Sequence, residues 1–107
     1  MDNAAAVEKM IGYAEKVLSY CKDLTYEEFS NNSLVVDASV FNLSQIGELT
    51  GKIDVDYKQE HPEIPWREMY GLRNRVVHDY EGVNLQLVWE IIKEDLPQLL
   101  DDLKGLV

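Results

Sequence analysis

The sequence predicts an all-α fold, an up-and-down bundle of four main helices with a short extra helix. Apolar residues recur at helical spacing in four long segments, residues 3–22, 34–52, 65–78 and 84–103. No segment alternates apolar and polar residues as a half-buried strand would. Capping residues and prolines stand near the expected helix ends. The 107 residues fit a single domain, residues 1–107, with one core.

The first helix, residues 3–22, can be capped by Asp2 or Asn3, because either side chain can accept a hydrogen bond from the free amide groups of the first turn. Thr25 and Glu28 then form a T-x-x-E capping box, which predicts a short helix at residues 26–30. The apolar stripe of the first helix contains Val7, Met10, Ile11, Ala14, Val17, Leu18 and Cys21.

The second long helix, residues 34–52, combines an apolar stripe with an unusually polar flank. Gly47 costs up to ~1 kcal/mol relative to alanine inside a helix, so we interpret it as a place where another backbone comes close. The polar flank is either a solvated face or a surface that faces Arg73 or a second subunit. The flank contains Asp37, Asn42, Gln45 and Glu48. The expected apolar stripe contains Leu34, Ala38, Phe41, Ile46, Leu49 and Ile53.

After a short helix near residues 55–60, Pro65 should open the third main helix at its first position, where a missing amide hydrogen costs nothing. This helix should end near His78, followed by a turn at residues 79–83. Asn84 should cap the fourth helix, which carries the cleanest apolar stripe of the chain. Pro97 should kink that helix near residues 93–96. The stripe contains Leu85, Val88, Trp89, Ile92, Leu96, Leu99, Leu100 and Leu103.

Composition and charge narrow the classes of function. The net charge of −10 argues against a broad surface for nucleic acid or acidic membranes, although a local basic site is compatible with it. The single cysteine, Cys21, cannot form an internal disulfide, and we expect a buried thiol in a reducing compartment. Without a signal peptide or a membrane-spanning segment, we expect a cytoplasmic protein with no membrane contact.

Residues 65–80 form a basic, aromatic island that also holds one of the two histidines. All three arginines of the protein lie there against two acidic residues, a balance of +1. At about 100° per residue, Arg73 falls near the middle of an apolar arc, where a guanidinium is costly unless it is paired or faces a cleft. The arc contains Trp66, Met69, Tyr70, Leu72, Val76 and Val77.

Two interpretations of Arg73 and His78 stay open on spacing alone. Arg73 can make a structural ion pair with Glu48 or Asp37, while His78 interacts with the dipole at the helix C-terminus. Alternatively, Arg73 and His78 face a pocket together. The two residues lie about 140° apart around a helix, so they meet only if Arg73 reaches around or the helix unwinds before His78.

The pattern Arg73-Asn74-x-x-x-His78-x-Tyr80 resembles the R-N-x-x-x-H-x-Y signature of HEPN-domain proteins, specifically the HepT-like toxins. The resemblance covers roughly residues 3–104, and flanking blocks match in the expected order. These blocks are Gln45-Ile46-Gly47-Glu48, Pro62-Glu63-Ile64-Pro65-Trp66, Gly71-Leu72-Arg73-Asn74, Val88-Trp89 and Asp95-Leu96-Pro97.

The resemblance implies a HEPN-like bundle that forms a homodimer through the face carrying Arg73 and His78. It also implies a metal-independent ribonuclease toxin that acts on RNA without a cofactor, in a type VII-like toxin–antitoxin pair with an MNT-type nucleotidyltransferase. His78 would then act as general acid/base. Arg73 would stabilise charge on the phosphoryl oxygens, and Asn74 would orient the imidazole or the phosphate. Tyr80 matches the tyrosine that the partner adenylylates, which would block the cleft.

A second hypothesis is a non-catalytic HEPN module that binds a nucleotidyltransferase or a nucleotide. In that case Arg73 contacts a phosphate and Tyr80 is modified, but no RNA is cut. A metal site built from His78, Asp79 and Glu81 is disfavoured, because these residues straddle the expected helix end and the spacings of zinc sites are absent.

Overall fold

The computed structural model describes residues 2–81 and 84–107, and for residues 79–81 it describes the backbone alone. No strand occurs in these parts of the chain, so the predicted all-α class is confirmed. The helices are α1 (Asn3–Cys21), α2 (Tyr26–Ser30), α3 (Ser33–Thr50), α4 (Val55–Glu60), α5 (Trp66–Tyr70), α6 (Leu72–Glu81), α7 (Leu85–Glu90), the π-helical segment η1 (Ile91–Asp95) and α8 (Leu96–Lys104).

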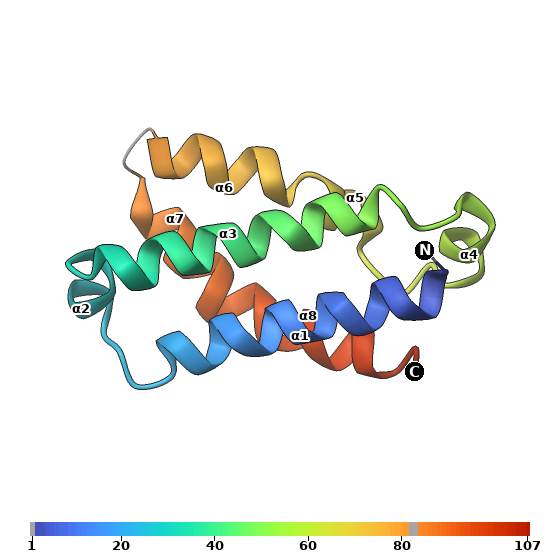
Figure 1. Ribbon diagram of the computed structural model, residues 1–107, viewed down its shortest axis with the longest axis horizontal. Helices are drawn as coiled ribbons and strands as arrows, with labels where there is room; N and C mark the ends of the chain where they lie inside the picture. The colour runs from blue at the N-terminus through green and yellow to red at the C-terminus, as the bar shows by residue number, and fades with distance from the viewer. Residues whose placement is uncertain (1, 82–83) are drawn as a thin grey trace.

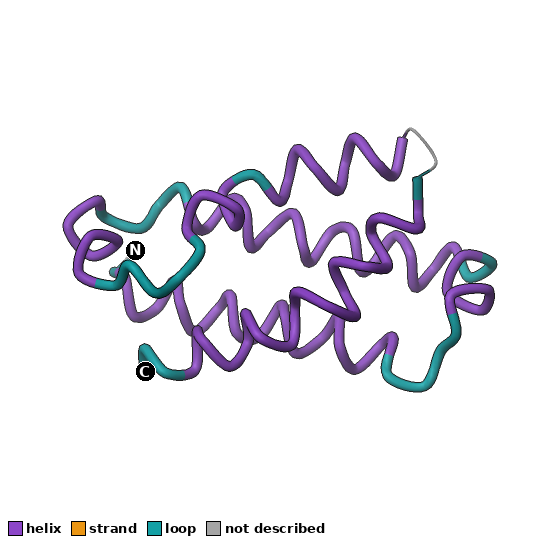
Figure 2. Tube along the Cα trace, turned by 180° about the vertical axis from the view of Figure 1, so that it is seen from behind, coloured by secondary structure: helices purple, strands orange, loops and turns teal. Residues whose placement is uncertain are grey.

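Four helical stretches run up and down along the long axis of the molecule, which measures 41 × 25 × 21 Å (Figure 1). They are α1, α3, α5 followed by α6, and α7 followed by η1 and α8. Helix α3 packs against both α1 and α6, and α8 packs against α1. The short helices α2 and α4 lie at opposite ends, as the view from behind also shows (Figure 2).

The predicted helix caps are present. The Asp2 carboxylate accepts a hydrogen bond of 2.7 Å from an amide in the first turn of α1. Thr25 and Glu28 form the reciprocal capping box of α2, with hydrogen bonds of 2.9 and 3.1 Å. Asn84 accepts a hydrogen bond from the first turn of α7, as predicted. Asn32, which was not singled out from the sequence, caps α3 in the same way. Local sequence therefore determines where these helices begin.

The buried face of α3 differs from the predicted stripe. Leu34 and Phe41 are 78% and 59% exposed, although both were expected in the core. Residues seven apart share a helix face, so Leu34, Phe41 and Glu48 lie along one exposed side of α3. Asn42, assigned to the polar flank, is instead buried and donates a hydrogen bond to a carbonyl of its own helix. The core side of α3 contains Val36, Ser39, Val40, Leu43, Ile46, Gly47, Leu49 and Thr50.

Gly47 marks the crossing of α3 and α6, as the sequence predicted. A Cβ atom at this position would stand 2.8 Å from the backbone nitrogen of Arg73 and 3.3 Å from the carbonyl oxygen of Met69. Real Cβ atoms essentially never approach another heavy atom that closely, so only glycine lets the two backbones pack at this distance.

The expected single helix at residues 65–78 is two helices, which corrects both its continuity and its ends. Helix α5 ends at Tyr70, Gly71 forms a turn, and α6 continues through Glu81 instead of ending near His78. Pro65 is the residue before α5 and not its first helical residue. Glycine has a low helix propensity, which allows the turn.

The predicted apolar arc was also too wide. At 100° per residue the buried residues Met69, Leu72 and Val76 span about 60°, and the exposed Tyr70 and Arg73 lie outside that span.

The predicted irregularity before Pro97 is a π-helical turn. Proline has no amide hydrogen for the bond to the carbonyl four residues earlier, and one extra residue per turn accommodates the defect. The wider turn buries both Ile91 and Ile92. It also lets Lys93 donate a hydrogen bond of 2.8 Å to the carbonyl of Cys21, at the C-terminal end of α1.

The core includes Cys21, as predicted, and its thiol lies 3.7 Å from the Ser39 hydroxyl. Burial raises the pKa of the Cys21 thiol, while the contact with Ser39 and the charge of Lys93 lower it in part. A buried, protonated thiol is a poor nucleophile. Among the described helices, none is long and apolar enough to cross a membrane.

Replacing Gly47 with alanine should lower the free energy of unfolding by about 1–3 kcal/mol, because the added methyl group forces α3 and α6 apart. Urea denaturation followed by circular dichroism measures this change.

The matched control is Gly12→Ala in α1, where an added Cβ meets nothing within 4 Å. This variant should gain up to ~1 kcal/mol from helix propensity. Equal stability changes in the two variants would contradict the close helix crossing at Gly47.

Candidate functional site

A hollow of about 280 Å³ lies where α3 ends against the junction of α5 and α6. Its lining combines two glycines, an ion pair, a lysine, a tyrosine and an asparagine. The lining residues are Gly47, Glu48, Gly51, Lys52, Tyr70, Arg73 and Asn74.

Arg73 forms an ion pair with Glu48, with 2.7 Å between Nε and Oε1. Both side chains are about half exposed, so the pair contributes little to stability, roughly 0–1 kcal/mol. The contact corresponds to the structural ion pair considered from the sequence. It also places a permanently charged guanidinium at the edge of the hollow, where it can contact a ligand. A guanidinium carries five N–H donors, and the contact with Glu48 engages Nε.

His78 lies one turn beyond Asn74 on α6, and both side chains are exposed. Residues at i and i+4 are neighbours on a helix surface, with Cβ atoms about 5–6 Å apart. The helix does not unwind before His78, so Arg73 and His78 keep their angular separation of about 140°. The hollow accordingly brings Arg73 and Asn74 together, while His78 is not among its lining residues.

Tyr80 belongs to the last turn of α6, two residues beyond His78. Its side chain lies outside the described residues, as do the side chains of Asp79 and Glu81. In the part of the chain whose side chains are described, no group of histidine, cysteine, aspartate and glutamate residues could hold a metal ion.

The charges around the hollow differ from those of the whole chain. Its lining carries two cations, Lys52 and Arg73, and one carboxylate, Glu48, which sum to +1 in a chain of net charge −10. An anionic group such as a phosphate is therefore favoured here relative to the rest of the surface.

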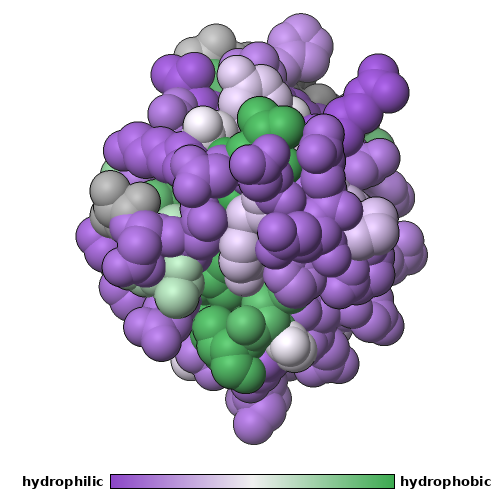
Figure 3. Space-filling view, turned by 90° about the vertical axis from the view of Figure 1, so that its right-hand side faces the viewer, coloured by the Kyte–Doolittle hydropathy of each residue, from purple (hydrophilic) through white to green (hydrophobic). Residues whose placement is uncertain are grey.

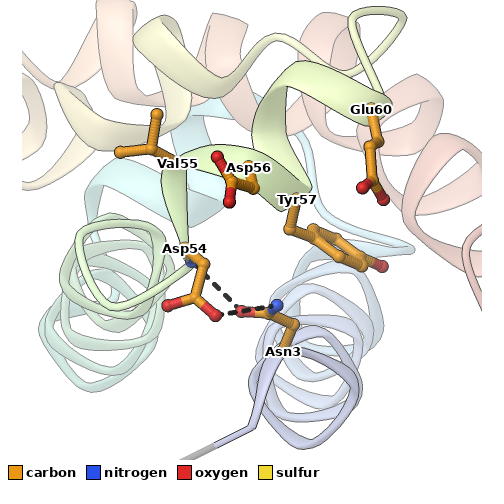
Figure 4. A pocket seen from close by; sticks show the side chains of 6 residues that line it. All are labelled: Asn3, Asp54, Val55, Asp56, Tyr57 and Glu60. Atoms are coloured by element: carbon orange, nitrogen blue, oxygen red, sulfur yellow. Dashed lines mark hydrogen bonds between the residues drawn. The ribbon is translucent and has the colours of Figure 1, made fainter.

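Two other hollows have acidic surroundings. One, of about 430 Å³, lies between the start of α1 and α4, where Asn3 and Asp54 bond to each other twice, at 3.1 and 3.3 Å (Figure 4). The end of the molecule that carries α4 has a mostly hydrophilic surface (Figure 3). The other hollow, of about 480 Å³, lies between α5–α6 and α8. Its acidic lining residues are Glu68, Glu94, Asp95 and Asp102, against Arg75. Carboxylates repel phosphate, so neither hollow suits an anionic ligand.

The hollow between α3 and the α5–α6 junction contains three residues that the sequence pattern did not single out as site residues, Gly51, Lys52 and Tyr70. Tyr70 was assigned to the apolar arc, but it is 63% exposed. A narrower apolar arc would have excluded it, because at 100° per residue Tyr70 lies about 100° or more from the buried Met69, Leu72 and Val76. No local pattern marks Lys52, which follows the end of α3.

Comparison with known proteins shows similarity to ribonucleases. The family model "Ribonuclease HepT-like" matches residues 10–106. "Putative RNase MJ1380" of Methanocaldococcus jannaschii is 38% identical over 92% of this chain and 90% of its own length. "Probable ribonuclease HepT" of Thermococcus cleftensis is 36% identical over 79% of this chain and 77% of its own length.

"Putative RNase MJ0125" of Methanocaldococcus jannaschii is 32% identical over 99% of this chain and 91% of its own length. No solved structure matches the chain. The family model spans nearly the whole chain, including the hollow between α3 and α6 and the segment from Arg73 to Tyr80. The chain therefore belongs to the HepT-like ribonuclease family of HEPN proteins.

Proposed function

We propose that this protein is a metal-independent endoribonuclease that acts as a dimer. The observation that carries the proposal is the exposure of three side chains on α6, the guanidinium of Arg73, the amide of Asn74 and the imidazole of His78, in a chain of the HepT-like ribonuclease family. These groups can bind a phosphate and transfer protons without a metal ion.

In the proposed reaction, His78 accepts the proton of a ribose 2′-hydroxyl, and the 2′-oxygen attacks the adjacent phosphorus. The bond from phosphorus to the 5′-oxygen breaks, and the protonated His78 donates the proton it has accepted to that leaving oxygen. The products are a 2′,3′-cyclic phosphate and a 5′-hydroxyl end. Arg73 stabilises the charge that develops on the phosphoryl oxygens, and Asn74 orients the imidazole or the phosphate.

The helix geometry supports an active site built from two chains. Arg73 and His78 of one chain diverge by about 140° on a continuous helix, so one chain does not direct both at the same phosphate. The exposed apolar residues Leu34 and Phe41 lie on the same side of α3 as Glu48, the partner of Arg73. Exposed apolar side chains beside a polar site favour association with another surface. A symmetric dimer through this face would pair the Arg73 of one chain with the His78 of the other.

The proposal includes regulation as a toxin. An MNT-type nucleotidyltransferase partner would transfer AMP from ATP to the Tyr80 hydroxyl, forming an ester bond and releasing pyrophosphate. Tyr80 follows His78 by two residues, so the bound nucleotide would add bulk and negative charge beside the active site. Both effects would exclude RNA.

A second candidate is a non-catalytic module that binds the nucleotidyltransferase or a nucleotide. The 2.7 Å ion pair of Arg73 with Glu48 favours it, because an arginine with a structural partner needs no catalytic role. Cleavage assays separate the two candidates.

Replacing His78 with alanine should lower RNA cleavage by about 10²–10⁴-fold, the contribution typical of general acid–base catalysis. The assay uses a fluorescent RNA in excess chelator, with circular dichroism to verify the helical fold. His61→Ala, at the other histidine of the chain, is the matched control and should cleave normally. Undiminished cleavage by the His78 variant would exclude this mechanism.

Mixing equal amounts of the inactive Arg73→Ala and His78→Ala proteins should restore about one quarter of wild-type cleavage. Half of the dimers then contain one chain of each variant, and in each such dimer one of the two composite sites is intact. Fluorescence energy transfer between two differently labelled subunits measures the exchange. If the subunits exchange fully and no cleavage returns, the active site is not composed of Arg73 and His78 from different chains.

Co-expression with an MNT-type nucleotidyltransferase should add the mass of one AMP group to the peptide that contains Tyr80, as measured by mass spectrometry. The modified protein should no longer cleave RNA. A Tyr80→Phe variant should stay unmodified, because it lacks the phenolic hydroxyl. Modification that persists in this variant would place the acceptor elsewhere.

A further inference from the structure

We propose that the hollow between α3 and the α5–α6 junction binds one unpaired nucleotide of single-stranded RNA, with its base stacked on Tyr70 and its phosphate contacted by Lys52 and Arg73. This assignment rests on the proposed ribonuclease function and specifies which form of RNA the site takes. Tyr70 and Lys52 are binding residues in it, and they take no part in bond making or breaking.

Tyr70 suits a stacking role because its ring is both exposed and supported. It is 63% exposed, although it ends a helix whose Trp66 and Met69 are buried. Its Cε2 atom lies 3.1 Å from the position of an ideal Cβ at Gly51, so the ring rests against the end of α3 where that residue has no side chain. A tyrosine held in this way presents an aromatic surface with little loss of conformational freedom on binding.

The charges beside the ring suit a phosphate. Lys52 and Arg73 outnumber Glu48 in the lining of the hollow, which leaves a local charge of +1. Glu48 contacts Arg73 through Nε and thereby holds the guanidinium at the edge of the hollow. Arginine can use its remaining donors for a phosphate oxygen, and lysine adds a flexible point charge.

The volume of the hollow suits one small ligand, such as a single nucleotide, and not an RNA duplex. Its volume of about 280 Å³ lies just under the usual range for small-molecule sites, which is roughly 300–1,000 Å³. Proteins that recognise single-stranded RNA stack unpaired bases on aromatic side chains and follow the backbone with cations. A paired base has its faces covered by neighbouring base pairs, so Tyr70 selects single strands.

The position of the hollow relates it to the proposed chemistry. Arg73 belongs both to the hollow and to the proposed reaction, and Tyr70 precedes Arg73 by three residues. A base stacked on Tyr70 would therefore hold the phosphate of its nucleotide at Arg73. Proximity of this kind lowers the entropic part of a reaction barrier.

The test measures binding without cleavage, using the full-length protein and a fluorescent 2′-O-methyl RNA oligonucleotide that lacks the attacking hydroxyl. Tyr70→Ala should raise Kd about 5- to 150-fold, the range that base–aromatic stacking contributes. Tyr70→Phe should bind like the wild type, because the ring is kept. Tyr20→Ala, at a tyrosine of α1 that is 39% exposed, is the matched control and should not change Kd.

The salt dependence of binding tests the phosphate contact separately. Lys52→Ala should reduce the slope of log K against log salt by about 0.7, the value for one phosphate contact on a single strand. Tyr70→Ala should leave that slope unchanged. Lys22→Ala, at an exposed lysine after α1, is the control. An unchanged slope in the Lys52 variant would overturn its assigned role.

An abasic scan of the oligonucleotide identifies the stacked base. One abasic position should weaken binding to the wild type but not to Tyr70→Ala, because the two changes remove the same interaction. Additive losses at every position would overturn the stacking role. So would a Tyr70→Ala variant that becomes monomeric in size-exclusion chromatography, since Tyr70 would then serve the dimer. Free AMP that binds as tightly as the RNA would assign the hollow to mononucleotides instead.

The outcomes also separate this assignment from the proposed ribonuclease function. Binding that depends on Tyr70 and Lys52, in a protein that cleaves no RNA, would support the subsite and exclude the ribonuclease. Cleavage that depends on His78, combined with normal RNA binding by Tyr70→Ala, would support the ribonuclease and exclude the subsite.

Discussion

The backbone of α6 packs on α3 at Gly47, and the candidate site depends on this contact. The position of a Cβ atom on Gly47 falls 2.8 Å from the Arg73 nitrogen, so the start of α6 rests directly on α3. At that distance the Arg73 side chain reaches the next residue of α3, Glu48, at 2.7 Å. The same packing brings Tyr70 against Gly51, the residue that follows the last turn of α3. A larger side chain at Gly47 would therefore disrupt both contacts, that of Arg73 with Glu48 and that of Tyr70 with Gly51.

Two irregularities interrupt the helical stretches, and the first of them lies beside that contact. The turn at Gly71 divides the third helical stretch. Tyr70, just before the turn, is exposed, while Met69 and Leu72 are buried. The π-helical turn before Pro97 buries Ile91 and Ile92 and allows Lys93 to reach the end of α1. Helices tolerate such defects where tertiary packing offsets the lost hydrogen bonds, and they often occur near functional sites.

The uneven distribution of charge allows an acidic protein to bind a phosphate group at one place on its surface. The net charge of −10 disfavours RNA over most of the surface, and the hollows near Asp54 and Glu68 are acidic. The hollow beside Arg73 has a balance of +1. Of the three hollows compared, the hollow beside Arg73 is therefore the one whose lining favours an anionic group. The apolar side chains exposed along α3 lie on the same side of that helix as Glu48, so association of two chains would bring two such sites close together.

Local sequence determined the helical class, the caps at Asp2 and Thr25, the buried Cys21 and the close helix crossing at Gly47, because each follows from spacing or from the chemistry of one residue. The motif at Arg73 and His78 also identified the family. Only the tertiary structure decided which face of α3 is buried, where the third helix breaks and what surrounds Arg73. The hollow beside Arg73 combines residues from α3, from the segment after α3 and from α5 and α6. Contacts between such distant segments leave no periodic pattern in the sequence.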